Sequence, residues 1–103
     1  MTDETATGPT PEDEALAHEA AYLRDTPVET ILANHLYVLL QVAALRLAEE
    51  PPRLDAAQLV IDTVAAVLGA GGERLGEHAD LYRRALAELQ QAYVRAATRP
   101  PPM

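Results

Sequence analysis

A long apolar segment between two proline signals is the feature that most constrains the fold of this chain. Thr26 and Pro27 are typical of a helix start, and Glu29 completes a capping box. Pro51 and the proline after it end the helix, because proline disfavours helical geometry in the preceding residue. The segment 27–50 is therefore predicted to form one helix, about 35 Å long at a rise of about 1.5 Å per residue.

The helical wheel of this segment is apolar over an unusually wide arc. Its mid-section polar residues Thr30, Asn34 and Gln41 share one narrow strip. A surface helix carries an apolar stripe a little over about 100° wide, and this arc is about twice as wide. The helix must be covered on two sides, which predicts an interface besides the packing within the chain. The predicted interface residues are Ile31, Leu32, His35, Leu36, Leu39, Val42 and Ala43.

A second helix is predicted over residues 55–69. Asp55 is its expected N-cap, with Gln58 as the capping-box partner, and the glycine-rich run that starts at Gly69 ends it. Gln58 and Asp62 fall outside its apolar arc. The residues within the arc, expected to face the core, are Ala57, Val60, Ile61, Val64, Val67 and Leu68.

A third helix, over residues 77–98, has the most regular periodicity in the chain. Its apolar residues alternate by four and three positions, which is the spacing of a coiled-coil seam. Asp80–Arg84 and Arg84–Glu88 are expected to pair on its outer surface. The seam residues are Leu75, Ala79, Tyr82, Leu86, Leu89, Tyr93 and Ala96.

The two ends of the chain differ from this helical domain. Residues 1–29 carry eight acidic residues and one arginine, whereas the rest of the chain carries eight acidic residues and seven arginines. Residues 1–26 are predicted to be an acidic flexible segment, with a possible short helix at 11–24 that Thr10 caps. Residues 99–103 form a proline-rich tail.

These patterns predict an all-α protein. Alanine and leucine supply 35 of the 103 residues, and phenylalanine and tryptophan, which strands favour, are absent. The helical domain, residues 27–98, is expected to be a small three-helix bundle or helical hairpin with one long apolar helix. A homodimer with the long helices across a two-fold axis would cover the excess apolar arc. A different partner protein would cover it equally well.

The inventory of reactive side chains argues against an enzyme. Cysteine, lysine and serine are all absent, which excludes thiolate metal sites, Schiff bases and serine or cysteine nucleophiles. We predict no catalytic residues, no cofactor and no metal site.

Three local patterns resemble functional motifs. The run Gly69–Gly72 lacks the Gly-Lys of a phosphate loop and is interpreted as a helix cap and turn. His18 opens a zincin-like motif, but Tyr22 replaces its second histidine ligand. His35 falls within the apolar arc, where it is either a pH-sensitive group or a structural residue at an interface.

Charge and hydropathy narrow the classes of partner. No basic face is visible, so direct binding to nucleic acid or to an anionic membrane is not expected. The longest strongly apolar run, Leu36–Leu45, is about half the roughly 20 residues of a membrane span. The acidic N-terminus does not fit a signal peptide. We predict a cytoplasmic protein.

Residues 54–94 resemble a bacterial family, domain of unknown function 1844. The resemblance lies in the Ile61-Asp62 helix, the turn Gly72-x-x-Leu75 and the final helix Leu86-x-x-Leu89-Gln90-x-Ala92-Tyr93. It implies a small cytoplasmic helical protein without assigned activity or catalytic residues. Genes of the family appear near translation genes in some high-GC bacteria, which implies a translation-linked partner.

Two functions follow as hypotheses. The first is a non-enzymatic helical interaction module that self-associates through its long apolar helix. The alternative is a translation- or ribosome-linked accessory factor that docks on a basic protein surface through its acidic N-terminal segment.

Overall fold

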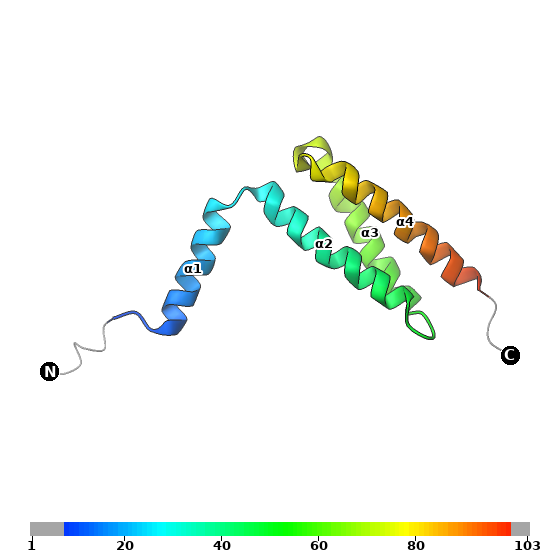
Figure 1. Ribbon diagram of the computed structural model, residues 1–103, viewed down its shortest axis with the longest axis horizontal. Coiled ribbons are helices and arrows are strands. Elements are labelled where there is room, and N and C mark those ends of the chain that lie inside the picture. Colours follow the sequence, from blue (N-terminus) through cyan, green and yellow to red (C-terminus); the bar gives the residue numbers. More distant parts are fainter. Residues whose placement is uncertain (1–7, 100–103) are drawn as a thin grey trace.

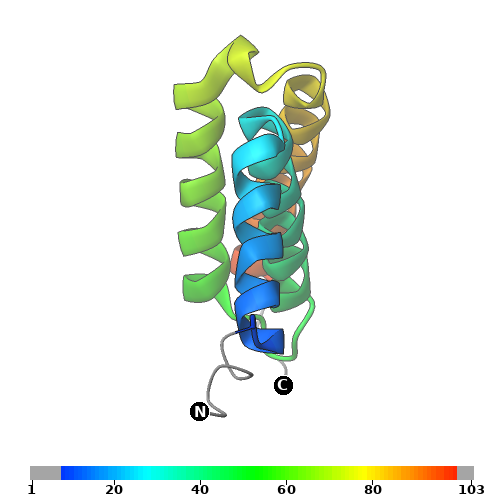
Figure 2. The same cartoon turned by 90° about the vertical axis from the view of Figure 1, so that its left-hand side faces the viewer.

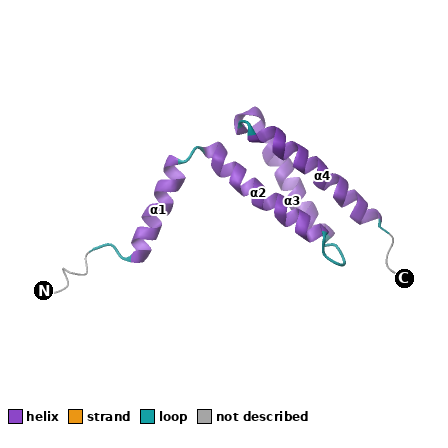
Figure 3. Ribbon diagram, in the orientation of Figure 1, coloured by secondary structure: helices purple, strands orange, loops and turns teal. Residues whose placement is uncertain are grey.

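The computed structural model describes residues 8–99, and all its regular elements are helices (Figures 1 and 3). The all-α prediction is confirmed. In chain order, the elements are α1 (Pro11–Asp25), α2 (Val28–Leu47), α3 (Leu54–Gly71), the 3-10 helix η2 (Gly72–Leu75) and α4 (His78–Thr98).

Helix α1 lies apart from the other helices and projects from the start of α2 (Figure 1). It occupies the place of the possible helix 11–24, and a capping box holds its first turn. The Asp13 backbone N–H donates to Thr10 Oγ1 over 3.0 Å, and the Thr10 N–H donates to Asp13 Oδ2 over 3.2 Å. None of its residues is buried. Residues 1–7 of the predicted flexible segment, and residues 100–103 of the tail, lie outside the described residues.

The boundary between α1 and α2 corrects one capping prediction. Thr26 does not cap α2; its N–H donates to the Tyr22 carbonyl over 3.0 Å and closes α1. Pro27 takes the N-cap position of α2, and no side chain caps that end. The physical reason is that α2 begins at Val28, so the N-cap position falls on Pro27, whose side chain has no hydrogen-bonding group.

The glycine-rich turn and the other helix ends also differ in detail from the predictions. Helix α2 ends at Leu47, three residues before Glu50, and α3 starts at Leu54 with no side-chain cap from Asp55. Gly69 lies within α3, and the turn is made instead by Gly72 and Gly76, whose positive φ angles of 53° and 76° suit glycine.

One core lies between α2, α3 and α4, which lie beside one another, with α3 antiparallel to the other two (Figures 1 and 2). Each helix contributes residues spaced by three and four positions, so that their side chains point to a common axis. The predicted seam of α4 is buried from Leu75 to Leu86 and half-buried from Leu89 to Ala96. The buried residues are Ala33, Leu36, Leu40, Ala43 and Leu47 of α2, Ala57, Ile61, Val64 and Leu68 of α3, and Leu75, Ala79, Tyr82 and Leu86.

Candidate interaction surfaces

A second apolar stripe runs along the face of α2 that points away from the core. Its residues follow one another at intervals of three, four, three, four and three positions, the same alternation as the buried face. Val28, Val38 and Leu45 are 65%, 54% and 68% exposed. We call this set the outer stripe: Val28, Ile31, His35, Val38, Val42 and Leu45.

The predicted interface residues divide between three faces of α2. Ile31, His35 and Val42 belong to the outer stripe. Leu36 and Ala43 were wrongly placed at an interface, because they are 2% and 0% exposed within one chain and pack against α3 and α4.

Two more predicted residues, Leu32 and Leu39, lie on the flank between these faces. Leu39 packs against the core, whereas Leu32 is exposed. The prediction missed Val28, Val38 and Leu45. The signal that identifies them is the second alternation of three and four, interleaved with the first.

His35 is the one ionisable residue of the outer stripe, and it is exposed. Its Nδ1 lies 2.8 Å from the Ile31 carbonyl oxygen. A carbonyl only accepts hydrogen bonds, so Nδ1 carries the proton and donates it there, one turn back along the same helix. The Nε2 atom is left for contacts made across the stripe.

A groove between α2 and α4 forms a separate surface, with a volume of about 540 Å³. Tyr37 and Leu81, which are both exposed, lie on its two sides, and Arg95 lines it along α4. The other lining residues are Leu40, Gln41, Ala44, Tyr82, Ala85, Glu88, Leu89 and Ala92. Most of this lining is apolar, with a small number of polar groups.

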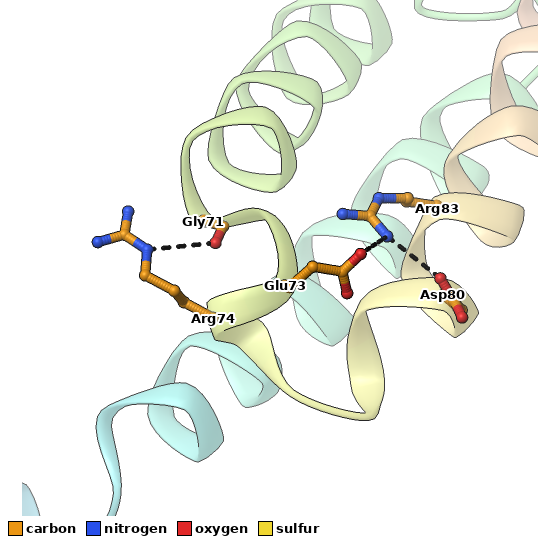
Figure 4. Close-up of polar contacts among 5 residues, drawn as sticks. All are labelled: Gly71, Glu73, Arg74, Asp80 and Arg83. Carbon is orange, nitrogen blue, oxygen red and sulfur yellow. Dashed lines mark hydrogen bonds and ion pairs between the residues drawn. The ribbon is translucent and has the colours of Figure 1, made fainter.

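The polar cluster at the α3–α4 junction stabilises a turn (Figure 4). Arg74 donates to the carbonyl of Gly71 over 3.4 Å, and another of its nitrogens donates to the Ala70 carbonyl over 2.9 Å. These carbonyls end α3 and lack partners within the helix, which is why an arginine there acts as a C-terminal cap.

Arg83 ties η2 to α4 in the same cluster. It lies 3.1 Å from Asp80 and 4.0 Å from Glu73 (Figure 4). Asp80 therefore pairs with Arg83 rather than with Arg84, contrary to the prediction from i,i+4 spacing. Glu73 and Asp80 are exposed and Arg83 is only half-buried, so these two ion pairs contribute little to stability.

Among residues 8–99, no group of three or more histidine, aspartate or glutamate residues is placed to hold a metal ion. His18 lies on exposed α1, and Tyr22, at the position of the missing ligand, accepts a hydrogen bond from Asn34 over 3.3 Å.

By length and composition, α2 and the stretch Leu54–Leu75 are each apolar enough to cross a membrane. The ten-residue run Leu36–Leu45 stops at the polar residues before it, whereas an average over a longer stretch also tolerates Asn34 and His35. The core helices of a soluble protein pass the same test. The cytoplasmic location and the absence of membrane binding stay predictions.

Comparison of the chain with protein-family models, with curated proteins and with solved structures finds no match in any of the three. The resemblance to domain of unknown function 1844 and the docking of the acidic segment on a basic protein surface stay predictions.

Proposed function

We propose that this chain is a non-enzymatic helical interaction module that self-associates through the outer stripe of α2. The observation that supports the proposal is the double periodicity of α2. One set of apolar residues lies in the core, and a second set with the same spacing stays at the surface, where Val28, Val38 and Leu45 are exposed and Ile31 and Val42 are half-buried. Contiguous exposed apolar surface of this kind marks interaction sites.

The order of residues along the stripe favours an antiparallel pair of α2 helices. The stripe is symmetric about the midpoint between His35 and Val38. A perpendicular two-fold axis there places Val28 opposite Leu45 of the partner subunit and Ile31 opposite Val42 of the partner subunit.

His35 distinguishes an antiparallel pair of α2 helices from a parallel pair. In the antiparallel pair, His35 faces Val38 of the partner subunit. In a parallel pair, His35 would face His35 of the partner subunit, which would bring two polar rings together at the centre of the interface and repel once they are protonated. Antiparallel helix dipoles are also the more favourable arrangement.

Sedimentation equilibrium of the full chain tests the proposal, with Val38→Asp as the disrupting variant and Leu59→Asp as the matched control. Leu59 is 69% exposed, but it lies on α3. We expect the wild type and Leu59→Asp to have twice the 11.1 kDa mass of the chain. We expect Val38→Asp to associate more weakly than the wild type, with unchanged helical circular dichroism.

Three results would contradict the proposal. The first is a Val38→Asp dimer as tight as that of the wild type. The second is a wild type that stays monomeric at about 1 mM, a concentration at which even a pair with a Kd of about 1 mM is partly dimeric. The third is flotation of the wild type with phosphatidylcholine liposomes, which would show that lipid covers the stripe.

A further inference from the structure

Helix α1 carries an apolar stripe that nothing in its own chain covers. Leu16, Ala20 and Leu23 follow at intervals of four and three, and the two leucines are 65% and 51% exposed. Isolated helices shorter than about 12–15 residues are marginal in water, and α1 has 15 residues. A capped helix of this length with no buried residue needs a surface to pack on.

The groove between α2 and α4 matches α1 in length. It follows α4 from Leu81 to Arg95, which is about 21 Å at a rise of about 1.5 Å per residue. Helix α1, from Pro11 to Asp25, is about 21 Å long by the same measure. Ala44, Ala85 and Ala92 leave room between the two walls for the side chains of an added helix.

Charge gives the direction of the added helix. The first turn of α1 holds three acidic residues, Glu12, Asp13 and Glu14. Within the described part of the chain, Arg95 forms no ion pair, although Glu88 also lines the groove. An α1 that runs antiparallel to α4 places its acidic turn beside Arg95 and opposes the two helix dipoles.

The geometry of the α1–α2 junction decides which chain supplies α1. Thr26 and Pro27 are both extended, with ψ angles of 136° and 137°, and α1 projects from the body (Figure 1). If it folded back as a hairpin, its roughly 21 Å would run beside α2 from Val28 and stop near Val42. Because α2 and α4 run in the same direction, the far end of the groove at Arg95 would stay uncovered.

We propose that α1 of one copy packs into the α2/α4 groove of a second copy, antiparallel to α4. Leu16, Ala20 and Leu23 then lie against Leu89, Ala85 and Leu81 of the partner subunit, in that order, and each body becomes a four-helix bundle with a borrowed helix. This surface is distinct from the outer stripe, and the inference rests on the proposed function only in that both require a second copy.

Paramagnetic relaxation in mixed samples tests this arm exchange in the full chain. The chain has no cysteine, so Ala17→Cys gives one site for a nitroxide label on α1, beside its apolar stripe. Spin-labelled chain at natural isotope abundance is mixed with ¹⁵N-labelled wild type. We expect the amide signals from Leu81 to Arg95 in the ¹⁵N chain to lose more than about half their intensity, with no such loss in α3.

A matched pair of variants controls the test. Leu16→Asp places a charge on the apolar stripe of α1 and is expected to abolish the broadening. Ala15→Asp places the same charge on the neighbouring exposed residue, outside the stripe, and is expected to preserve it.

Two outcomes would overturn the inference. The α4 amide signals could broaden only in a sample in which the nitroxide and the ¹⁵N label are on the same chain. That result would show that α1 folds back as a hairpin onto its own α2 and α4. The absence of broadening in both samples would leave the groove to some other partner.

The test also separates the inference from the proposed function. A wild-type dimer without broadening refutes arm exchange while pairing through the outer stripe stands. Broadening that persists in Val38→Asp, together with an unchanged dimer mass, supports arm exchange and refutes pairing through the stripe.

Discussion

Helices α2 and α3 are close in length and in hydropathy, yet they present different outer surfaces. Helix α2 and the stretch Leu54–Leu75, which is α3 together with η2, have the same mean hydropathy and the same buried share of 22%. The outer face of α3 is nevertheless polar or small apart from Leu59. Its other exposed residues are Asp55, Gln58, Asp62, Thr63, Ala66, Gly69 and Ala70.

The difference shows that an interaction surface is identified by the face of the helix on which the apolar side chains lie, more than by the number of apolar residues in the helix. Alanine raises the mean hydropathy of α3 while offering little surface to bury. On α2, the outer positions hold valine, isoleucine and leucine, with His35 as the exception. A mean over the window cannot separate these cases, whereas the position of each residue on the wheel can.

Matched leucine truncations on the two helices give the largest expected contrast in stability. Leu36→Ala removes a core side chain of α2 and is expected to lower the free energy of unfolding by about 2–5 kcal/mol. Leu59→Ala, on the outer face of α3, is expected to change it by less than about 0.5 kcal/mol. Urea denaturation at one protein concentration measures both. Equal losses would mean that Leu59 is covered in the folded protein.

Two glycines of α3 allow a pair of alanine substitutions with opposite expected effects on stability. The expected changes are smaller than that of Leu36→Ala. A Cβ at Gly71 would lie 2.7 Å from Cγ of buried Leu75, so Gly71→Ala is expected to cost about 1–3 kcal/mol. A Cβ at Gly69 meets nothing within 4 Å, so Gly69→Ala is expected to stabilise the helix by about 0.5–1 kcal/mol. Thermal unfolding followed by circular dichroism measures both signs. The packing of Leu75 against Gly71 is refuted if both variants stabilise the protein.

His35→Leu and its control give the smallest expected contrast, and they test the outer surfaces of α2 and α3 by adding a leucine to each. It makes the outer stripe wholly apolar and removes a polar ring from the interface, so self-association is expected to tighten about fivefold, or about 1 kcal/mol. Thr63→Leu adds a leucine to the outer face of α3 and is the control, with no change expected. Sedimentation equilibrium gives both dissociation constants. Weaker association of His35→Leu would show that the imidazole makes a polar contact across the interface.

Sequence periodicity was enough to predict the inner faces of α3 and α4. Each of these helices has one narrow apolar arc, and one arc can only face the core, so Ile61, Val64 and Leu86 were assigned correctly. Helix α2 has an arc too wide for such an argument. The part of this arc that faces the core is set by the side of α2 on which α3 and α4 pack, and the sequence of α2 alone does not give that side. For this reason Leu36 and Ala43 were assigned to the wrong surface.

Local capping signals were correct at one of the three helix starts that they predicted. Thr10 caps α1 as its sequence predicts. The signals at Thr26 and Asp55 failed because each helix begins one residue away from its predicted start, which moves the N-cap position to Pro27 and to Arg53. The groove between α2 and α4 had no sequence signal, because its walls come from segments that the chain separates by more than thirty residues.

The most direct test of the central claim is an isotope-filtered nuclear Overhauser experiment on an equal mixture of ¹³C-labelled and unlabelled chain. If α2 pairs through its outer stripe, contacts between chains will appear at the methyl groups of Val38 and Val42, and none will appear at Leu59. Contacts between chains at Leu59 without any at Val38, or no such contacts in a sample whose mass is that of a dimer, would contradict the account.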